Sequence, residues 1–243
     1  MGCTGAGLVA IIVLFIAVVL NAVSIILPAW STNKGVTDTG KADFAAGVWG
    51  YCTDVDISAA GDSNASITFD HCYFFHTTND YELPELNDAI MANFSKYSVC
   101  DGYDIASKES DAAALLYSQG LAMLAGLDEK QFDRFVDRSC GPLGSATLVF
   151  ASLSIVAGVF SFIALLLGVT CCKTKSAFVT FGKFLAIAAF ITTLLTFLMW
   201  LGQVHPLSKK DDVGYGGAFI LSVLAAVLYL IVVTLVARHS KMR

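Results

Sequence analysis

Charged residues are spread so unevenly that they divide the chain into four long uncharged stretches and one polar segment. Asp, Glu, Lys and Arg are missing from residues 1–33, 141–172, 184–208 and 213–237. A helix that rises about 1.5 Å per residue needs about 20 apolar residues to cross a hydrocarbon core of about 30 Å, and each stretch contains such a run. We therefore expect four membrane spans, at residues 8–29, 143–170, 184–203 and 214–237.

The first of these spans has a second interpretation, as a cleaved signal peptide. No Lys or Arg precedes it, and Pro28-Ala29-Trp30 is a poor small-residue cleavage site. Its apolar run is also longer than the roughly 7 to 15 residues of a signal sequence. We interpret the segment as a retained helix.

Basic residues predict the orientation of the spans. They cluster in the predicted loop 171–183 and in the tail 238–243, as Lys173, Lys175, Lys183, Arg238, Lys241 and Arg243. Cytoplasmic loops carry an excess of Lys and Arg, so both segments are expected in the cytoplasm. Four spans then place residues 1–7 there as well, and loops 30–142 and 204–213 outside. The expected location is the plasma membrane.

The large outer segment is strongly acidic. The whole chain is 56% hydrophobic and 14% charged with a net charge of −5, but residues 31–141 contain 18 acidic against 7 basic residues, a net charge of −11. The electrostatic field of this negative charge attracts cations and basic partners within about 8 Å at physiological salt. The alternative is a solvated face that keeps this segment soluble.

The outer segment contains two different sequence patterns, one typical of strands and one typical of helices. Residues 47–76 contain GVWGYCT and SITFDHCYFFH, rich in aromatic and β-branched residues, on either side of the polar stretch DVDISAAGDSN. They predict two antiparallel strands. Residues 82–140 are typical of helices in LPELNDAIMANF, SKESDAAALLYSQGLAMLAGL and DEKQFDRFVDRSC.

The middle helix is predicted to be amphipathic and capped near Ser107, with an apolar face formed by Leu115, Leu116, Leu121 and Leu124. The expected fold is a membrane all-α four-helix transmembrane bundle with a small extracellular β-sheet plus helices.

Four of the seven cysteines, Cys52, Cys72, Cys100 and Cys140, lie in the outer segment. An even number in an oxidising compartment predicts two disulfides, with three possible pairings. We favour Cys52 with Cys72, because both lie on the predicted paired strands, which leaves Cys100 with Cys140. A structural zinc site formed with His71 and His76 is the alternative.

Two kinds of modification are expected. Glycosylation is predicted at Asn64 and Asn93, each of which begins an acceptor sequence in the outer segment. Palmitoylation is predicted at the juxtamembrane Cys171 and Cys172. Cys3 is also expected in the cytoplasm, at or near a membrane boundary. Small apolar residues at a helix end are the alternative for these cysteines.

Most forms of transport and catalysis have no support in the sequence. No ionisable residue lies deep in a span, whereas pumps and transporters normally retain some. Small residues spaced by four, such as Ser154 with Gly158 and Ala157 with Ser161, favour a closely packed bundle instead. The sequence contains no phosphate loop, HExxH or serine elbow, so we expect no enzyme, cofactor, metal or nucleic-acid partner.

Trp30, then Gly47-Val48-Trp49, Cys52 and Cys72 together resemble the signature of the claudin superfamily, which includes claudins, peripheral myelin protein, calcium-channel gamma subunits and fungal four-span proteins of the eisosome type. The resemblance implies a left-handed bundle, a sheet held by a Cys52–Cys72 disulfide, and Trp30 and Trp49 anchoring the sheet to the top of the bundle. It also departs from the claudin pattern. Val48 replaces Leu, the cysteine interval is wide, the first outer loop is longer than in claudins, and the final His-Ser-Lys-Met-Arg lacks the Tyr-Val ending.

The resemblance implies a non-enzymatic protein of cell-cell adhesion, junctions or membrane organisation that acts through its acidic outer loop. Its partners would be membrane lipids and, laterally, itself or other four-span proteins. The alternative is an auxiliary, gamma-type subunit of an ion channel or receptor, because loop length is closer to that group. Its partner would then be a pore-forming subunit.

Overall fold

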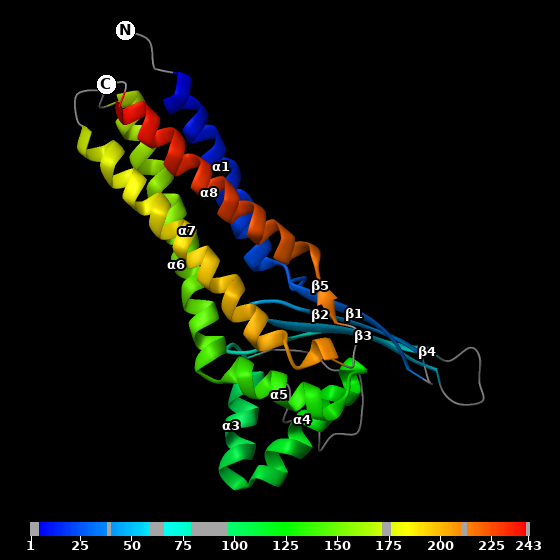
Figure 1. Ribbon diagram of the computed structural model, residues 1–243. Helices are drawn as coiled ribbons and strands as arrows, with labels where there is room; N and C mark the ends of the chain where they lie inside the picture. The colour runs from blue at the N-terminus through cyan, green and yellow to red at the C-terminus, as the bar shows by residue number, and fades with distance from the viewer. Residues whose placement is uncertain are drawn as a thin grey trace. The chain divides into compact units, whose positions relative to one another are not determined.

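The computed structural model describes residues 5–37, 40–58, 66–78, 97–171, 176–209 and 213–241 (Figure 1). The chain folds into two compact parts. Unit 1 falls within residues 1–26, 147–198 and 217–243, and unit 2 within residues 27–146 and 199–216.

Four long helices supply unit 1: α1 (Gly5–Ile26), α6 (Pro142–Leu166), α7 (Ser176–Val204) and α8 (Gly217–Lys241). Each is long and apolar enough to cross a membrane, which confirms that expectation and is consistent with a multi-pass membrane protein. After α6 the chain continues as a π-helical turn, Leu167–Cys171. Helix α7 begins at Ser176, inside the segment predicted as a loop, because nothing from Ser176 to Lys183 is a proline that would prevent helix formation.

Side-chain hydrogen bonds tie the helices of unit 1 together. Helix α1 packs along α8 (Figure 1). The buried Asn21 Nδ2 on α1 donates to Ser154 Oγ on α6 at 2.8 Å. Ser161 Oγ donates to the carbonyl oxygen of Gly182 on α7 at 2.8 Å. Such bonds contribute to helix association in lipid, where apolar burial alone does not distinguish one helix from its surroundings.

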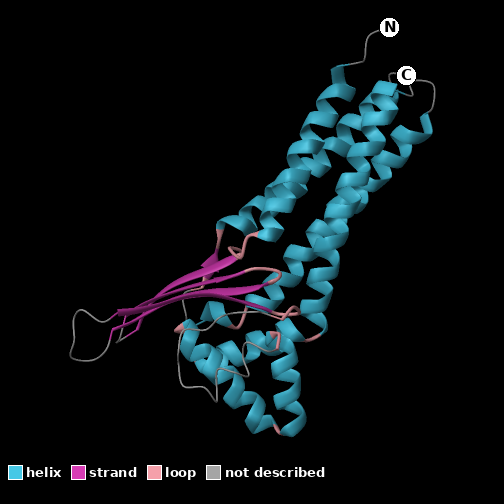
Figure 2. Cartoon of the chain, turned by 180° about the vertical axis from the view of Figure 1, so that it is seen from behind, coloured by secondary structure: helices cyan, strands magenta, loops and turns pink. Residues whose placement is uncertain are grey.

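Unit 2 contains a five-stranded antiparallel sheet in the order β4-β3-β2-β1-β5 (Figure 2). Its strands are β1 (Ser31–Thr37), β2 (Gly40–Ala46), β3 (Gly50–Ser58), β4 (Ser66–Phe74) and β5 (Gly214–Tyr215). The two predicted strands correspond to β3 and β4. The sequence did not predict β1 and β2, because STNKGVT and GKADFAA are polar or small and lack an alternating apolar pattern.

The register gives the sheet two ends with different composition. One row across all five strands is formed by Tyr215, Ser31, Ala46, Tyr51 and Tyr73, and we call this the base end. A second row, which we call the charged row, consists of Lys34, Asp43, Asp54 and Asp70. On each of these four strands it lies three residues away from the residue that belongs to the base end.

In the described part of unit 2 three helices accompany the sheet: α3 (Val99–Glu109), α4 (Asp111–Ala125) and α5 (Glu129–Cys140). The predicted cap at Ser107 is wrong, because Ser107 lies inside α3 and its hydroxyl donates to the carbonyl oxygen of Asp104. Ser110 takes that role. Its extended backbone separates α3 from α4, and its hydroxyl accepts the amide proton of Ala113 at 3.1 Å. The predicted helix LPELNDAIMANF lies outside the described residues.

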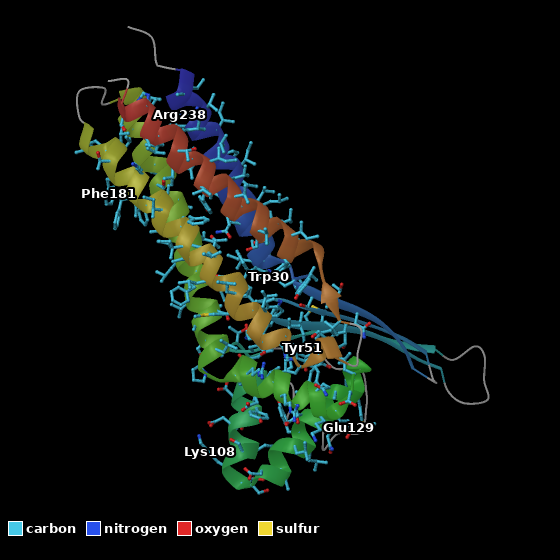
Figure 3. The ribbon with its side chains drawn as sticks, viewed as in Figure 1. Trp30, Tyr51, Lys108, Glu129, Phe181 and Arg238 are labelled. Atoms are coloured by element: carbon cyan, nitrogen blue, oxygen red, sulfur yellow. A yellow bond between two sulfur atoms is a disulfide. The ribbon has the colours of Figure 1, made fainter. Side chains whose placement is uncertain are left out.

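Aromatic rings form the core of unit 2. Phe132 on α5 lies 5.4 Å from Tyr51 and 6.2 Å from Phe44, measured between ring centroids. Trp30 packs edge-on to Trp200 at 5.8 Å, and Trp200 Nε1 donates to Ser31 Oγ at 3.0 Å. Figure 3 labels Trp30 and Tyr51 in this core. Sheet and helices are thus joined by edge-to-face ring contacts, which stabilise beyond the burial of area alone.

Candidate interaction surface

Two disulfides fix the scaffold of unit 2, and they join the pairs that the strand interpretation favoured. Cys52 bonds Cys72 directly opposite it on β3 and β4, and Cys100 on α3 bonds Cys140, the last residue of α5. From the loops they close, the chain-entropy model gives roughly 3 and 4 kcal/mol of stabilisation. The zinc alternative is wrong, because both sulfur atoms it needs are held in a covalent bond.

Most of the predicted modification sites lie outside the part of the chain that the structure describes. Asn64, Asn93, Cys172 and Cys3 lie outside the described residues. Cys171 ends the π-helical turn after α6. Glycosylation and palmitoylation therefore stay predictions.

The motif residues that carry the family resemblance lie near the base end of the sheet. A Cβ on Gly47 would lie 2.8 Å from Pro28 Cα and 2.9 Å from the carbonyl oxygen of Leu27, so this close approach requires glycine. Trp30 is fully buried within unit 2. Trp49 is 41% exposed.

Helix α4 is apolar on both of its faces. One face is buried, where the helix contacts β2 and β3, and consists of Ala114, Ser118, Leu121, Ala122 and Ala125. The other face exposes Leu115 by 41%, Leu116 by 69% and Met123 by 72%. We call these three residues the α4 stripe.

Helix α5, in the same unit, differs from α4 in that it combines a buried apolar face with many charged residues. It buries Phe132, Phe135 and Val136, and its remaining positions include Glu129, Lys130, Arg134, Asp137 and Arg138. Helix α4 carries only one charged residue, Asp111, at its first position. An exposed stripe of large apolar side chains is therefore a specific feature of α4, and such patches commonly mark interaction sites.

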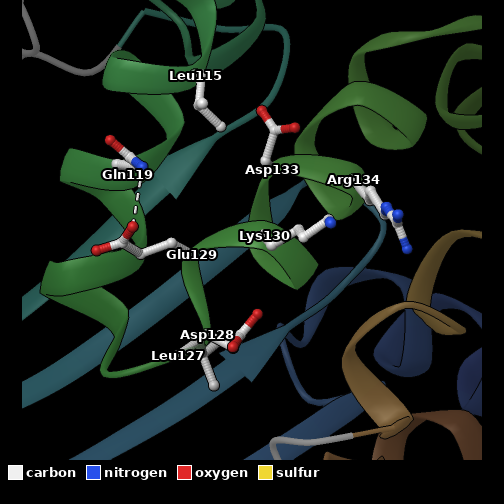
Figure 4. Close-up of a pocket in the computed structure, with 8 residues that line it drawn as sticks. All are labelled: Leu115, Gln119, Leu127, Asp128, Glu129, Lys130, Asp133 and Arg134. Carbon is white, nitrogen blue, oxygen red and sulfur yellow. Dashed lines mark hydrogen bonds between the residues drawn. The ribbon is translucent and has the colours of Figure 1, made fainter.

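An open groove of about 720 Å³ lies beside the α4 stripe, between α4 and α5 (Figure 4). Apolar and charged groups line it together: Leu115, Gln119, Leu127, Asp128, Glu129, Lys130, Asp133 and Arg134. Gln119 Nε2 reaches across the groove and donates to Glu129 Oε2 at 2.9 Å. The groove thus presents both signs of charge around a leucine.

Carboxylates order this part of unit 2 and perturb nearby phenols. Asp133 accepts a hydrogen bond from the buried Ser118 hydroxyl at 2.6 Å, which joins α5 to α4. Burial and, secondarily, the charges of Asp133, Asp137 and Asp111 raise the pKa of Tyr103 to about 12. Both effects disfavour the ionised phenol.

The α4 stripe corrects one sequence expectation. Leu115, Leu116, Leu121 and Leu124 were predicted to form a single apolar face, but Leu121 is fully buried while Leu115 and Leu116 are exposed. The sequence contains one feature that could have predicted the exposed apolar residues: no charged residue occurs from Ala112 to Leu127. An ordinary surface helix carries charged residues on the face turned to water.

Among the described residues, no group of three or more His, Cys, Asp or Glu side chains could hold a metal ion. Comparison with known proteins adds no assignment, because no protein-family model and no curated protein matches the chain. The resemblance to the claudin superfamily rests on Trp30, Gly47, Trp49, Cys52 and Cys72.

Proposed function

We propose that this is a non-enzymatic, claudin-like four-span protein of the plasma membrane that acts in cell-cell adhesion or membrane organisation. In this proposal both termini are cytoplasmic and unit 2 faces the outside. The protein works by association, with itself or with other four-span proteins, through unit 2.

The observation that carries the proposal is the α4 stripe. Leu116 and Met123 are exposed by 69% and 72% on a helix whose opposite face already covers the sheet. Burial of such side chains in a complex removes apolar area from water and so favours association. The adjoining groove supplies charged groups of both signs, which is the usual arrangement of an apolar centre with a polar rim.

A double substitution tests this surface. We expect Leu116→Ser with Met123→Ser to reduce self-association strongly in mild detergent and to reduce aggregation of cells that display the protein. Because both side chains are exposed, the thermal stability of unit 2 should stay nearly unchanged. Ile105→Ser is the matched control, since Ile105 is a 44% exposed aliphatic residue on the neighbouring helix α3. Association that persists in the double variant, or falls equally in the control, contradicts the role of the stripe.

The length of the outer loop favours a second candidate function, that of an auxiliary subunit of a channel or receptor. The same stripe would then bind a pore-forming chain. Purification in mild detergent distinguishes the two functions, because adhesion predicts homopolymers whereas an auxiliary subunit is recovered in fixed ratio with a larger membrane protein. Labelling intact cells with a membrane-impermeant reagent tests the orientation on which both functions depend.

A further inference from the structure

Four large apolar side chains are exposed at the base end of the sheet in unit 2. They are Leu27 at 41%, Trp49 at 41%, Phe74 at 39% and Tyr215 at 62%. The pairing places Trp49 and Phe74 near the β4 edge of this end, because Phe74 lies opposite Gly50 and the amide of Phe75 donates to the carbonyl oxygen of Trp49. Tyr215 lies opposite Ser31 at the same end, but on the other edge strand, β5, so the group is spread across the width of the sheet. Leu27 joins this group through its close approach to Gly47.

The chain connects this end of the sheet directly to two of the apolar helices. Leu27 directly follows Ile26, the last residue of α1, so their Cα atoms are about 3.8 Å apart. Tyr215 is separated from Gly217, the first residue of α8, by a single glycine. The base end is therefore linked by one or two peptide bonds to the end of α1 and the start of α8, each of which is long and apolar enough to cross a membrane.

Charge changes abruptly along the same strands. Residues 27–33, 44–53, 71–79 and 213–216, which supply the base end, contain no Asp, Glu, Lys or Arg. The charged row of Lys34, Asp43, Asp54 and Asp70 lies three residues away from the row of Ser31, Ala46, Tyr51 and Tyr73 at the base end. At about 3.3 Å per residue this separation is about 10 Å. The headgroup layer on one side of a bilayer is about 5 to 8 Å thick, so the uncharged length of the strands is sufficient to cross it.

We infer that the base end of the sheet is a membrane-interface anchor, in which Leu27, Trp49, Phe74 and Tyr215 lie among the lipid headgroups and upper acyl chains. Trp and Tyr favour this layer because their rings combine an apolar body with a polar group. The strand positions of the charged row then lie beyond the headgroup layer. The partner of this surface is the lipid bilayer rather than another protein, and the α4 stripe remains the surface for protein association.

Quenching of Trp49 fluorescence tests the anchor in lipid nanodiscs. The difference in emission between the wild-type protein and Trp49→Phe isolates Trp49, because the other two tryptophans, Trp30 and Trp200, are both fully buried. We expect lipids brominated near the top of the acyl chains to remove most of this difference emission. Lipids brominated near the chain ends should remove much less, and aqueous acrylamide should remove little.

Tyr215→Trp in the Trp49→Phe background provides a second reporter at the same end, and the same pattern is expected for it. Strong quenching of either reporter by acrylamide, with no response to brominated lipid, would mean that the base end faces water and would overturn the inference. Quenching by neither reagent would mean that protein covers the surface, which also overturns it. Neither outcome bears on the α4 stripe, so failure of the anchor and failure of the adhesion proposal are distinguishable.

Discussion

Truncation of Phe132 probes the aromatic core that joins α5 to the sheet. Phe132 is fully buried, and its ring lies 5.4 Å from Tyr51, 5.8 Å from Phe135 and 6.2 Å from Phe44 between centroids. Phe132→Ala removes these contacts and leaves a cavity, for which we expect a loss of about 3 to 5 kcal/mol. Each aromatic pair adds about 0.5 to 1.5 kcal/mol to simple area burial, so the upper half of that range is expected.

Tryptophan fluorescence measures this loss in unit 2 alone. All three tryptophans, Trp30, Trp49 and Trp200, belong to unit 2, and Trp200 lies 6.4 Å from Phe135. A loss of 1 kcal/mol lowers the melting temperature of a domain by about 2 to 8 °C, depending on its size. Thermal unfolding of Phe132→Ala in detergent should therefore occur about 10 °C or more below that of the wild-type protein.

Leu116→Ala is the matched control, because this side chain is 69% exposed and its truncation should change stability by less than about 0.5 kcal/mol. Phe132→Leu keeps most of the volume and should fall between the two variants. A melting temperature for Phe132→Ala within the error of the control would refute the claim that this ring cluster holds helices and sheet together.

Three further predictions concern a glycine, a tyrosine and a membrane hydrogen bond. Gly216→Ala should cost about 1 to 3 kcal/mol, because its Cβ would overlap a backbone carbonyl of the segment before β1, whereas Gly217→Ala has open space and should be tolerated in thermal unfolding. With the pKa of Tyr103 raised to about 12, only the unfolded phenol ionises near pH 10, so stability should fall as pH rises from about 10 to 12. Absorbance titration against Tyr103→Phe checks this, and ionisation near pH 10 in the folded protein would contradict it. Asn21→Leu should weaken the unit 1 bundle by about 0.6 to 1.7 kcal/mol, and a double-mutant cycle with Ser154→Ala should show coupling rather than additive losses.

The sequence was sufficient to predict the four apolar helices and the disulfide pairs. A run of about 20 uncharged residues has few alternatives to a membrane helix. Cys52 and Cys72 lie in runs rich in β-branched and aromatic residues, so their pairing followed from the strands that contain them.

Strands β1 and β2 and the α4 stripe could not be found in this way. Ser31–Thr37 and Gly40–Ala46 acquire their strand conformation from pairing with each other and with β3, and such tertiary partners leave no local pattern. The spacing of the leucines in α4 predicts a helix, but it does not predict which side of the helix is buried. Only the position of the sheet determines that Leu121 is buried and Leu116 is exposed.

The antiparallel pairing of β3 and β4 also sets the length of the hairpin that these two strands form. The paired residues run from Gly50 and Phe74 at one end to Ser58 and Ser66 at the other, and the disulfide lies near the first pair. Each residue pair added beyond Ser58 and Ser66 would lengthen the hairpin by about 3.3 Å without altering the covalent link or its surroundings. A longer hairpin of this kind would therefore move its far end away from the disulfide while the paired residues near Gly50 and Phe74 keep their positions.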